Sequence, residues 1–310
     1  MASLNRLIRL TLAYYDVFGM PLSGFEVWKH LLAPEGDAEG KWHPKYRLSD
    51  IERALEEDVT AEKIASRSGF YMLCGRESLV VRRREEDKVS SARLKRVKRL
   101  ASLLRYVPFV RMIGVTGSLA LKQSGKESDW DLFIVLTRGY IFTGRTVVTG
   151  FLHAIGKRRH GTLVRDRACL NYFVTEDGLE IGTKDLFSAH EYRFLIPVFG
   201  FHTFQRFERK NHWLARFKVN AMPTEVAPLW EVRDTVPARR IRAVFEALLA
   251  WHALEAWLAR WQTAKIRRNP KTAIPGGLIE TTDRSLIFLP KPRGPKVFEQ
   301  WKRRSGEVLF

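Results

Sequence analysis

A Gly-Ser pair followed by two alternating acids constrains this chain more than any other feature. An apolar run ends at Gly117 and Ser118, a short polar segment follows, and a second apolar run begins with Asp129 and Asp131. Residues two apart on a strand point to the same side, so the two aspartates can share a divalent cation. Hard oxygen ligands of this kind suit Mg²⁺, which also bridges to substrate phosphates. The layout predicts a site for a metal-bound nucleoside triphosphate.

The Gly-Ser pair also predicts the start of a helix. Free backbone N–H groups at a helix N-terminus attract anions, so Ser118 can hold a terminal phosphate through its hydroxyl and its amide, beside Gly117. Two lysines, Lys122 and Lys126, lie in the loop between the halves of the motif. They could reach the triphosphate oxygens, and they could equally be ordinary loop charges.

The segments around this motif alternate between strand and helix patterns. Apolar runs predict strands over 111–116, 131–136 and 168–175, and helical spacing predicts helices over 140–156 and 184–195. These residues are therefore expected to form a mixed α/β core.

The order Gly117, Ser118, Asp129 and Asp131 resembles the nucleotidyltransferase superfamily, which includes DNA polymerase beta and small antibiotic nucleotidyltransferases. The resemblance covers residues 110–195. It implies attack by an acceptor hydroxyl on the alpha phosphorus of a nucleoside triphosphate, with release of pyrophosphate. Two metal ions would hold the attacking and leaving oxygens, with Asp129 and Asp131 as shared ligands.

The family also uses a third carboxylate from a neighbouring strand, and this chain departs from that pattern. The best-placed polar residue on 168–174 is Asn171, which can offer a carbonyl oxygen to a metal but cannot accept a proton at neutral pH. Four carboxylates are open alternatives: Glu176, Asp177, Glu180 and Asp185. We therefore expect either a Mg²⁺-dependent nucleotidyltransferase, with nucleic acid or protein as the hydroxyl acceptor, or a non-catalytic nucleic-acid-binding regulator that retains a degenerate nucleotidyltransferase fold.

The net charge favours polyanionic partners. The chain has 53 Lys and Arg against 34 Asp and Glu, a net charge of +19 and a pI near 10.2. Such an excess predicts salt-sensitive association with RNA or DNA. Much of it lies on a helix expected between 77 and 105, which is either a phosphate-facing surface or a solvated connector.

The N-terminal residues resemble a winged helix, with three short helices before a hairpin expected over 70–81 and turning at Gly75. The third helix contains Glu52, Glu56, Glu57 and Asp58, and phosphates repel acidic side chains. A packing or protein-interaction role is therefore preferred to reading of duplex DNA.

The C-terminal third predicts one long helix from 239 to 261 whose wide apolar surface belongs against the core or against a partner, such as a second copy of the chain. Aromatic residues among Arg and Lys could stack bases, although most are expected in the core. A strand is expected over 285–289, followed by a basic helix through Arg304.

Cys74 and Cys169 lie in apolar segments and are expected to be buried thiols in a reducing cytosol. The chain nowhere runs long enough without charge to cross a bilayer, which predicts a cytoplasmic protein without a membrane partner. The expected fold class is mixed α+β in four parts: a winged-helix-like domain at 1–81, a basic connector helix at 82–108, a nucleotidyltransferase-like α/β core at 109–200 and a mainly helical region at 201–310.

Overall fold

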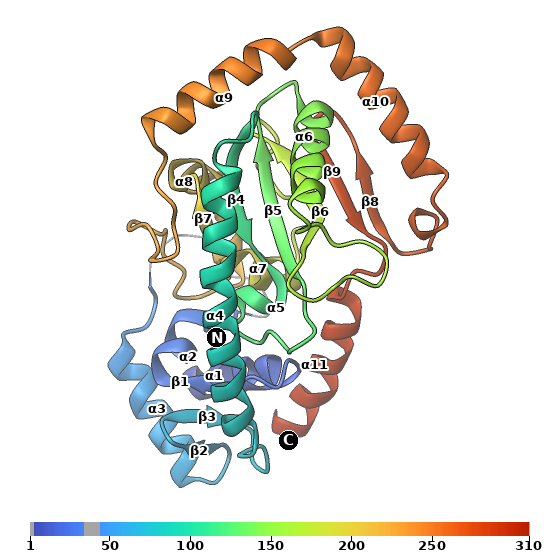
Figure 1. Cartoon of the computed structure of the whole chain (residues 1–310). Helices are drawn as coiled ribbons and strands as arrows, with labels where there is room; N and C mark the ends of the chain where they lie inside the picture. Colours follow the sequence, from blue (N-terminus) through green and yellow to red (C-terminus); the bar gives the residue numbers. More distant parts are fainter. Residues whose placement is uncertain (1–2, 34–43, 310) are drawn as a thin grey trace.

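A six-stranded mixed sheet forms the centre of the protein in a computed structural model, which describes residues 3–33 and 44–309 (Figure 1). The order across the sheet is β7-β4-β5-β6-β9-β8. Its strands are β4 (Val110–Val115), β5 (Trp130–Leu136), β6 (Ala168–Thr175), β7 (Ile196–Phe199), β8 (Leu278–Thr281) and β9 (Ser285–Leu289). Strands β5 and β6 run parallel, and the other neighbouring pairs are antiparallel. The strands expected over 111–116, 131–136, 168–175 and 285–289 are confirmed, and the fold is mixed α+β.

Both faces of the sheet are covered by helices, which explains why β5 reads as an uninterrupted apolar run. Leu132, Ile134 and Leu136 face a core shared with α4 (Leu79–Leu104) and α6 (Ile141–Ala154). Phe133 and Val135 face a second core shared with α7 (Leu186–Arg193) and α8 (Phe201–Lys210). The short helix α5 (Gly117–Ala120) lies between β4 and β5, and the 3-10 turns are η1 (His212–Arg216) and η2 (Pro270–Thr272).

A smaller N-terminal unit, the head, lies at one end of this sheet (Figure 1). It contains α1 (Leu4–Asp16), α2 (Gly24–His30) and α3 (Leu48–Thr60), with a three-stranded antiparallel sheet of β1 (Leu22–Ser23), β3 (Phe70–Met72) and β2 (Ala65–Arg67). Ser23 caps α2 in a reciprocal capping box with Glu26.

The hairpin expected over 70–81 is wrong in position. The chain turns instead at Ser68 and Gly69, where φ angles of 53° and 78° suit a tight two-residue turn between β2 and β3. Val80, a β-branched residue that favours strands, is buried together with Leu79 at the start of α4. Tertiary burial overrides the local preference of the valine.

The final helix, α11 (Gly294–Leu309), returns to the head and packs against α1 (Figure 1). The indole of Trp301 donates a hydrogen bond of 3.1 Å to the carbonyl of Leu10, and Arg304 forms an ion pair with Asp16. The basic helix expected at this end is confirmed, and it completes the core of the head.

The single helix expected over 239–261 is wrong, because two helices, α9 (Val236–Leu249) and α10 (His252–Arg267), meet at an elbow at Ala250. Glu246 of α9 pairs with Arg111 of β4 at 2.8 Å, whereas Glu255 of α10 accepts hydrogen bonds from the first amides of α6. The hydroxyl of Tyr140 donates to the carbonyl of Ala250 at 3.2 Å. These contacts hold the two helices in different directions, although the sequence has no Pro or Gly at the elbow.

The expectation of two buried thiols is also wrong, because Cys74 is exposed and Cys169 is half-buried at the edge of the site described below. Within the two described ranges, every helix is too short or too polar to cross a membrane.

Candidate active site

A pocket of about 710 Å³ lies where β5 and β6 begin, between α5, α7 and the segment that leads into α11. Four of its lining residues are those of the sequence motif: Gly117, Ser118, Asp129 and Asp131. Asn171 lines it as well. The fold therefore brings together five of the predicted site residues, although 54 positions separate Gly117 from Asn171 in the sequence.

Gly117 joins the two halves of the motif. Its φ of +64° lies in the left-handed region, and a Cβ at this position would be 2.5 Å from Oδ2 of Asp131. The amide of Thr116 also donates to the carbonyl of Asp131 at 3.0 Å. A glycine is therefore required for the turn after β4 to pass this close to the Asp131 carboxylate. Helix α5 is only one turn long, so Ser118 can offer its hydroxyl and amide but little helix dipole.

Asp131 has an unusually basic carboxylate. Burial, and then the nearby charge of Asp129, raise its pKa to about 6. On its other side, Nδ2 of Asn171 donates a hydrogen bond of 3.1 Å to Oδ1 of Asp131. Asn171 thus orients Asp131. It does not take the place of the third carboxylate that the sequence resemblance implies.

Asp129 carries a counterion from the chain itself. Nη1 of Arg159 lies 2.6 Å from Oδ2 of Asp129, and the same guanidinium contacts Sγ of Cys169 at 3.5 Å. Arg159 lies between α6 and β6, and its side chain is 44% exposed. The pair neutralises one of the two acids, while the exposed side chain has room to move away.

The acids fit a hard divalent cation. One oxygen each of Asp129 and Asp131 and Sγ of Cys169 all lie within 4.8 Å of one another. Burial, and then the charge of Asp131, raise the pKa of Cys169 to about 12, so the thiol remains protonated and is a poor ligand. The carboxylate oxygens are the ligands that Mg²⁺ prefers, and Mg²⁺ usually binds with one or two protein carboxylates, waters and substrate phosphates.

Three of the four alternative carboxylates point elsewhere. Glu176 pairs with Arg206 at 3.4 Å, Asp177 with Arg138 at 3.4 Å and Glu180 with Lys184 at 2.6 Å. Asp185 does line the pocket, where it caps α7 by accepting a hydrogen bond of 2.7 Å from the amide of Ser188.

Glu191 of α7 is the pocket carboxylate that the motif did not identify. Burial, and then the charge of Asp131, raise its pKa to about 7. A carboxylate whose pKa lies near neutrality is suited to accept and return a proton. Its neighbour His190 is buried and bonded through Nδ1 to the Tyr15 hydroxyl at 3.1 Å, so this histidine joins the head to the core.

The two predicted phosphate-binding lysines lie outside this pocket. Lys122 pairs with Asp87 of α4 at 3.1 Å, and the carbonyl of Lys126 accepts a hydrogen bond from Arg93. The cations that do line the pocket are Arg159, Lys291 and Arg293. Lys291 and Arg293 belong to a proline-rich segment before α11. They were not predicted as site residues because they lie far from the motif in the sequence.

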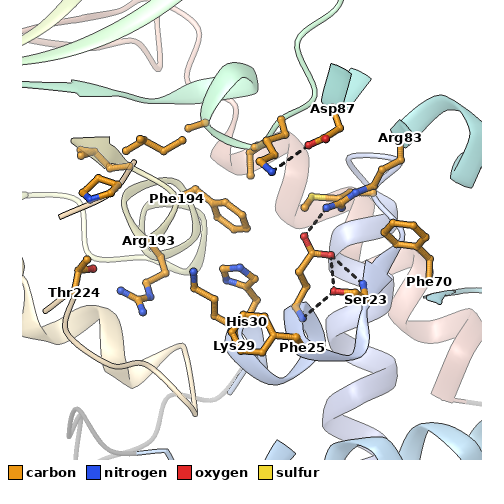
Figure 2. Close-up of a pocket in the computed structure, with 18 of the residues that line it drawn as sticks. Ser23, Phe25, Lys29, His30, Phe70, Arg83, Asp87, Arg193, Phe194 and Thr224 are labelled. Atoms are coloured by element: carbon orange, nitrogen blue, oxygen red, sulfur yellow. Dashed lines mark hydrogen bonds and ion pairs between the residues drawn. The ribbon is translucent and has the colours of Figure 1, made fainter. Parts of the chain in front are cut away.

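Lys122 instead lines a second pocket, of about 790 Å³, between the head and the core (Figure 2). Its two acids are paired, Glu26 with Arg83 at 2.5 Å and Asp87 with Lys122. Lys29, His30 and Arg193 lie together on one side (Figure 2). Burial, and then the charge of Arg193, lower the pKa of Lys29. Leu121 lines both pockets, so they are neighbours.

Comparison of the chain with models of protein families, with curated proteins and with solved structures finds no match. The residues of the site and their geometry are therefore the basis for assigning a function.

Proposed function

We propose that this protein is a Mg²⁺-dependent nucleotidyltransferase that moves a nucleoside monophosphate from a nucleoside triphosphate to a hydroxyl acceptor. The observation that carries the proposal is the contact between Gly117 and the carboxylate of Asp131, with Asp129 beside it in a pocket of about 710 Å³. A buried carboxylate with a raised pKa destabilises the fold at neutral pH, and a bound cation would offset that cost.

The arrangement of strands around the pocket also supports the proposed nucleotidyltransferase function. The Gly-Ser turn follows β4, the paired acids open β5, and Asn171 lies on β6, the neighbouring parallel strand. In the head, the order of three helices, β1 and the β2–β3 hairpin supports the expected resemblance to a winged helix. Its third helix, α3, exposes Glu52, Glu56 and Glu57, which favours contact with protein over contact with DNA.

In the proposed reaction, Asp129 and Asp131 would hold Mg²⁺, which would stabilise the negative charge of the phosphates. Arg159 leaves Asp129 and becomes available to a phosphate oxygen, as guanidinium groups bind phosphate well. Ser118 donates from its hydroxyl on one wall, and Lys291 and Arg293 approach from the segment before α11. These residues orient the triphosphate and neutralise the charge of departing pyrophosphate.

Glu191 is the proposed proton acceptor for the attacking hydroxyl. It shares the pocket with the two aspartates, and its pKa of about 7 lets it accept a proton at neutral pH. Asn171 is a positioning residue, because it touches Asp131 and has no basic group to offer.

The acceptor is expected to carry phosphate, as an RNA or DNA end does. The second pocket adjoins the first at Leu121 and has more cations than acids on its walls. Exposed Arg84 and Lys88 of α4 extend that charge outward. Nucleic-acid binding there is expected to weaken steeply with added salt.

The test is transfer of label from α-³²P nucleoside triphosphates, with Mg²⁺, to RNA, DNA and protein acceptors. We expect the wild type to transfer label and the double variant Asp129→Ala with Asp131→Ala to transfer none. The control variant Asp283→Ala, which removes an exposed acid, should retain label transfer. Transfer that survives loss of both pocket acids would refute the assignment.

A non-catalytic nucleic-acid-binding regulator is the second candidate, and the ion pair between Arg159 and Asp129 is the observation that favours it. In that case Arg159 permanently replaces the cation. Nucleic-acid binding with a steep salt dependence, unaffected by the aspartate substitutions and without label transfer or Mg²⁺ binding, would support the regulator.

A further inference from the structure

Helices α9 and α10 form an arch over the end of the sheet opposite the candidate active site (Figure 1). Both helices expose large apolar side chains. We call this surface the arch face. Its large exposed residues are Val236, Ile241, Val244, Phe245, Leu248, Trp251, Trp257 and Trp261. Leu248 is 61% exposed and Trp251 65%. Several large apolar side chains exposed along two consecutive helices indicate an interaction site.

The charge on the arch face has one sign. Six basic residues are exposed along the two helices: Arg239, Arg240, Arg260, Lys265, Arg267 and Arg268. The acids between 235 and 268 are Glu246 and Glu255, and both are turned inward to Arg111 and to the start of α6. The exposed side chains of the two helices therefore include aliphatic, aromatic and basic residues but no acid.

We propose that the arch face docks the protein on an anionic lipid surface. Helices that lie in the membrane interface have Trp, Phe and Leu on one side and Lys and Arg beside them, and anionic headgroups provide the complementary charge. Nucleic acid would use the rings of Trp251, Trp257 and Trp261 but gives no role to the aliphatic residues of α9. A second copy would bring two positive, acid-free faces together, which like-charge repulsion opposes.

The geometry of the fold suits this orientation. The arch is held at one end of the sheet by Tyr140, which follows β5, and by the bond from the Phe109 amide, which precedes β4, to Glu246. Asp129 and Asp131 lie at the other end of β5. Trp257 and Trp261 stack with planes 4° apart, and Lys265 lies 5.1 Å from the Trp261 ring centroid. Docking through the arch would leave the pocket open to the solvent. The sequence expectation of no membrane partner was based on the lack of a spanning segment, which a surface-bound helix does not need.

The test is cosedimentation of the full chain with vesicles of phosphatidylcholine alone and with about a third phosphatidylserine. We expect binding to the anionic vesicles, weak binding to the neutral ones, and quenching of tryptophan fluorescence by brominated acyl chains. The variant Trp251→Ser with Trp257→Ser and Trp261→Ser should lose roughly tenfold or more in vesicle affinity. The charge variant Arg239→Glu with Arg240→Glu should lose a similar amount.

The matched control is Phe25→Ser with Phe298→Ser, which removes rings that are 54% and 53% exposed on the head and on α11. It should bind vesicles as the wild type does. Failure to bind anionic vesicles overturns the proposal, as does binding that the tryptophan substitutions leave unchanged. Two other results also overturn it: a wild-type dimer that the tryptophan variant converts to a monomer, or a single-stranded oligonucleotide complex lost in that variant while vesicles stay unbound. None of these readouts depends on the proposed transferase activity.

Discussion

The carboxylate of Asp131 gives the protein a pH-dependent stability. Its folded pKa of about 6 lies above the ordinary value of 3.8, so the unfolded chain releases this proton first as pH rises. The free energy of unfolding therefore falls between those two values and stays low above the folded pKa. Asp131→Asn should be more stable than the wild type by up to about 3 kcal/mol at neutral or higher pH, and should lose this advantage in acid.

Urea unfolding across that pH range measures the difference, with the exposed Asp283→Asn as the control. An advantage of Asp131→Asn that is constant with pH would show that the charge of Asp131 is not the cause.

Arg159 competes with any cation for Asp129, because its guanidinium lies 2.6 Å from the carboxylate oxygen. Arg159→Ala should therefore bind Mg²⁺ several-fold more tightly than the wild type, by roughly 1 kcal/mol. Isothermal titration with Mg²⁺ measures this affinity. Arg165→Ala removes another exposed arginine of the same loop and should leave the affinity unchanged. Equal or weaker binding by Arg159→Ala would mean that the arginine does not occupy the metal position.

Gly117→Ala should strongly reduce nucleotide transfer, because the added methyl would lie 2.5 Å from Oδ2 of Asp131 and the residue has a φ of +64°. We expect a loss of about a hundredfold or more in kcat/KM, as displacement of a catalytic group by an ångström has that effect. Gly125→Ala is the control, since its nearest neighbour would be the Ser128 hydroxyl at 3.6 Å. Full activity of the Gly117→Ala variant would show that nucleotide transfer does not depend on the conformation of this turn.

At the scale of elements, Arg93 of α4 fixes the loop between the two halves of the motif. Its guanidinium is almost fully buried and donates to Ser124 Oγ at 2.6 Å, to the carbonyl of Gly125 and to Asp166 at 3.0 Å. Arg93→Ala would leave these acceptors without their donor and should reduce the free energy of unfolding by about 2–4 kcal/mol.

Chemical denaturation tests this value, and Arg99→Ala on the exposed side of α4 should change it by less than about 0.5 kcal/mol. Similar effects of the two substitutions would mean that α4 serves only as a charged connector.

The helices and strands that depend on the local pattern of apolar residues were predictable from the sequence. Those that depend on tertiary contacts were not. The apolar runs of β4, β5 and β6 and the spacing of Asp129 and Asp131 indicated the central strands and a shared acidic site. The elbow at Ala250 was missed because its causes, Glu246 bound to β4 and Glu255 bound to α6, are long-range contacts.

Long-range contacts also explain why some residues of the site were not predicted. Arg159 and Glu191 reach Asp129 and the pocket from a loop and a helix that no motif links to the Gly-Ser pair. Lys122 and Lys126 were placed in the site by proximity in sequence, whereas the loop turns them away toward α4 and solvent.

At the scale of the whole molecule, α11 is expected to determine the stability of the head. Trp301 is 6% exposed and belongs to the same apolar core as α1 and α2. Trp301→Ala should therefore cost about 3–5 kcal/mol and increase amide hydrogen exchange in α1 more than in β5. Phe298→Ala, on the exposed side of the same helix, should have little effect. Equal exchange in α1 of both variants would show that the head is stable without α11.

That shared core also sets an order for folding during translation. Val297 and Trp301 complete a cluster whose other members include Leu7, Ile8 and Leu22. Leu7, Ile8 and Leu22 therefore remain without part of their packing until nearly three hundred further residues, up to Trp301, have left the ribosome. Chain segments that expose apolar surface for so long are typical substrates of chaperones, and the head is where we expect this protein to depend on them.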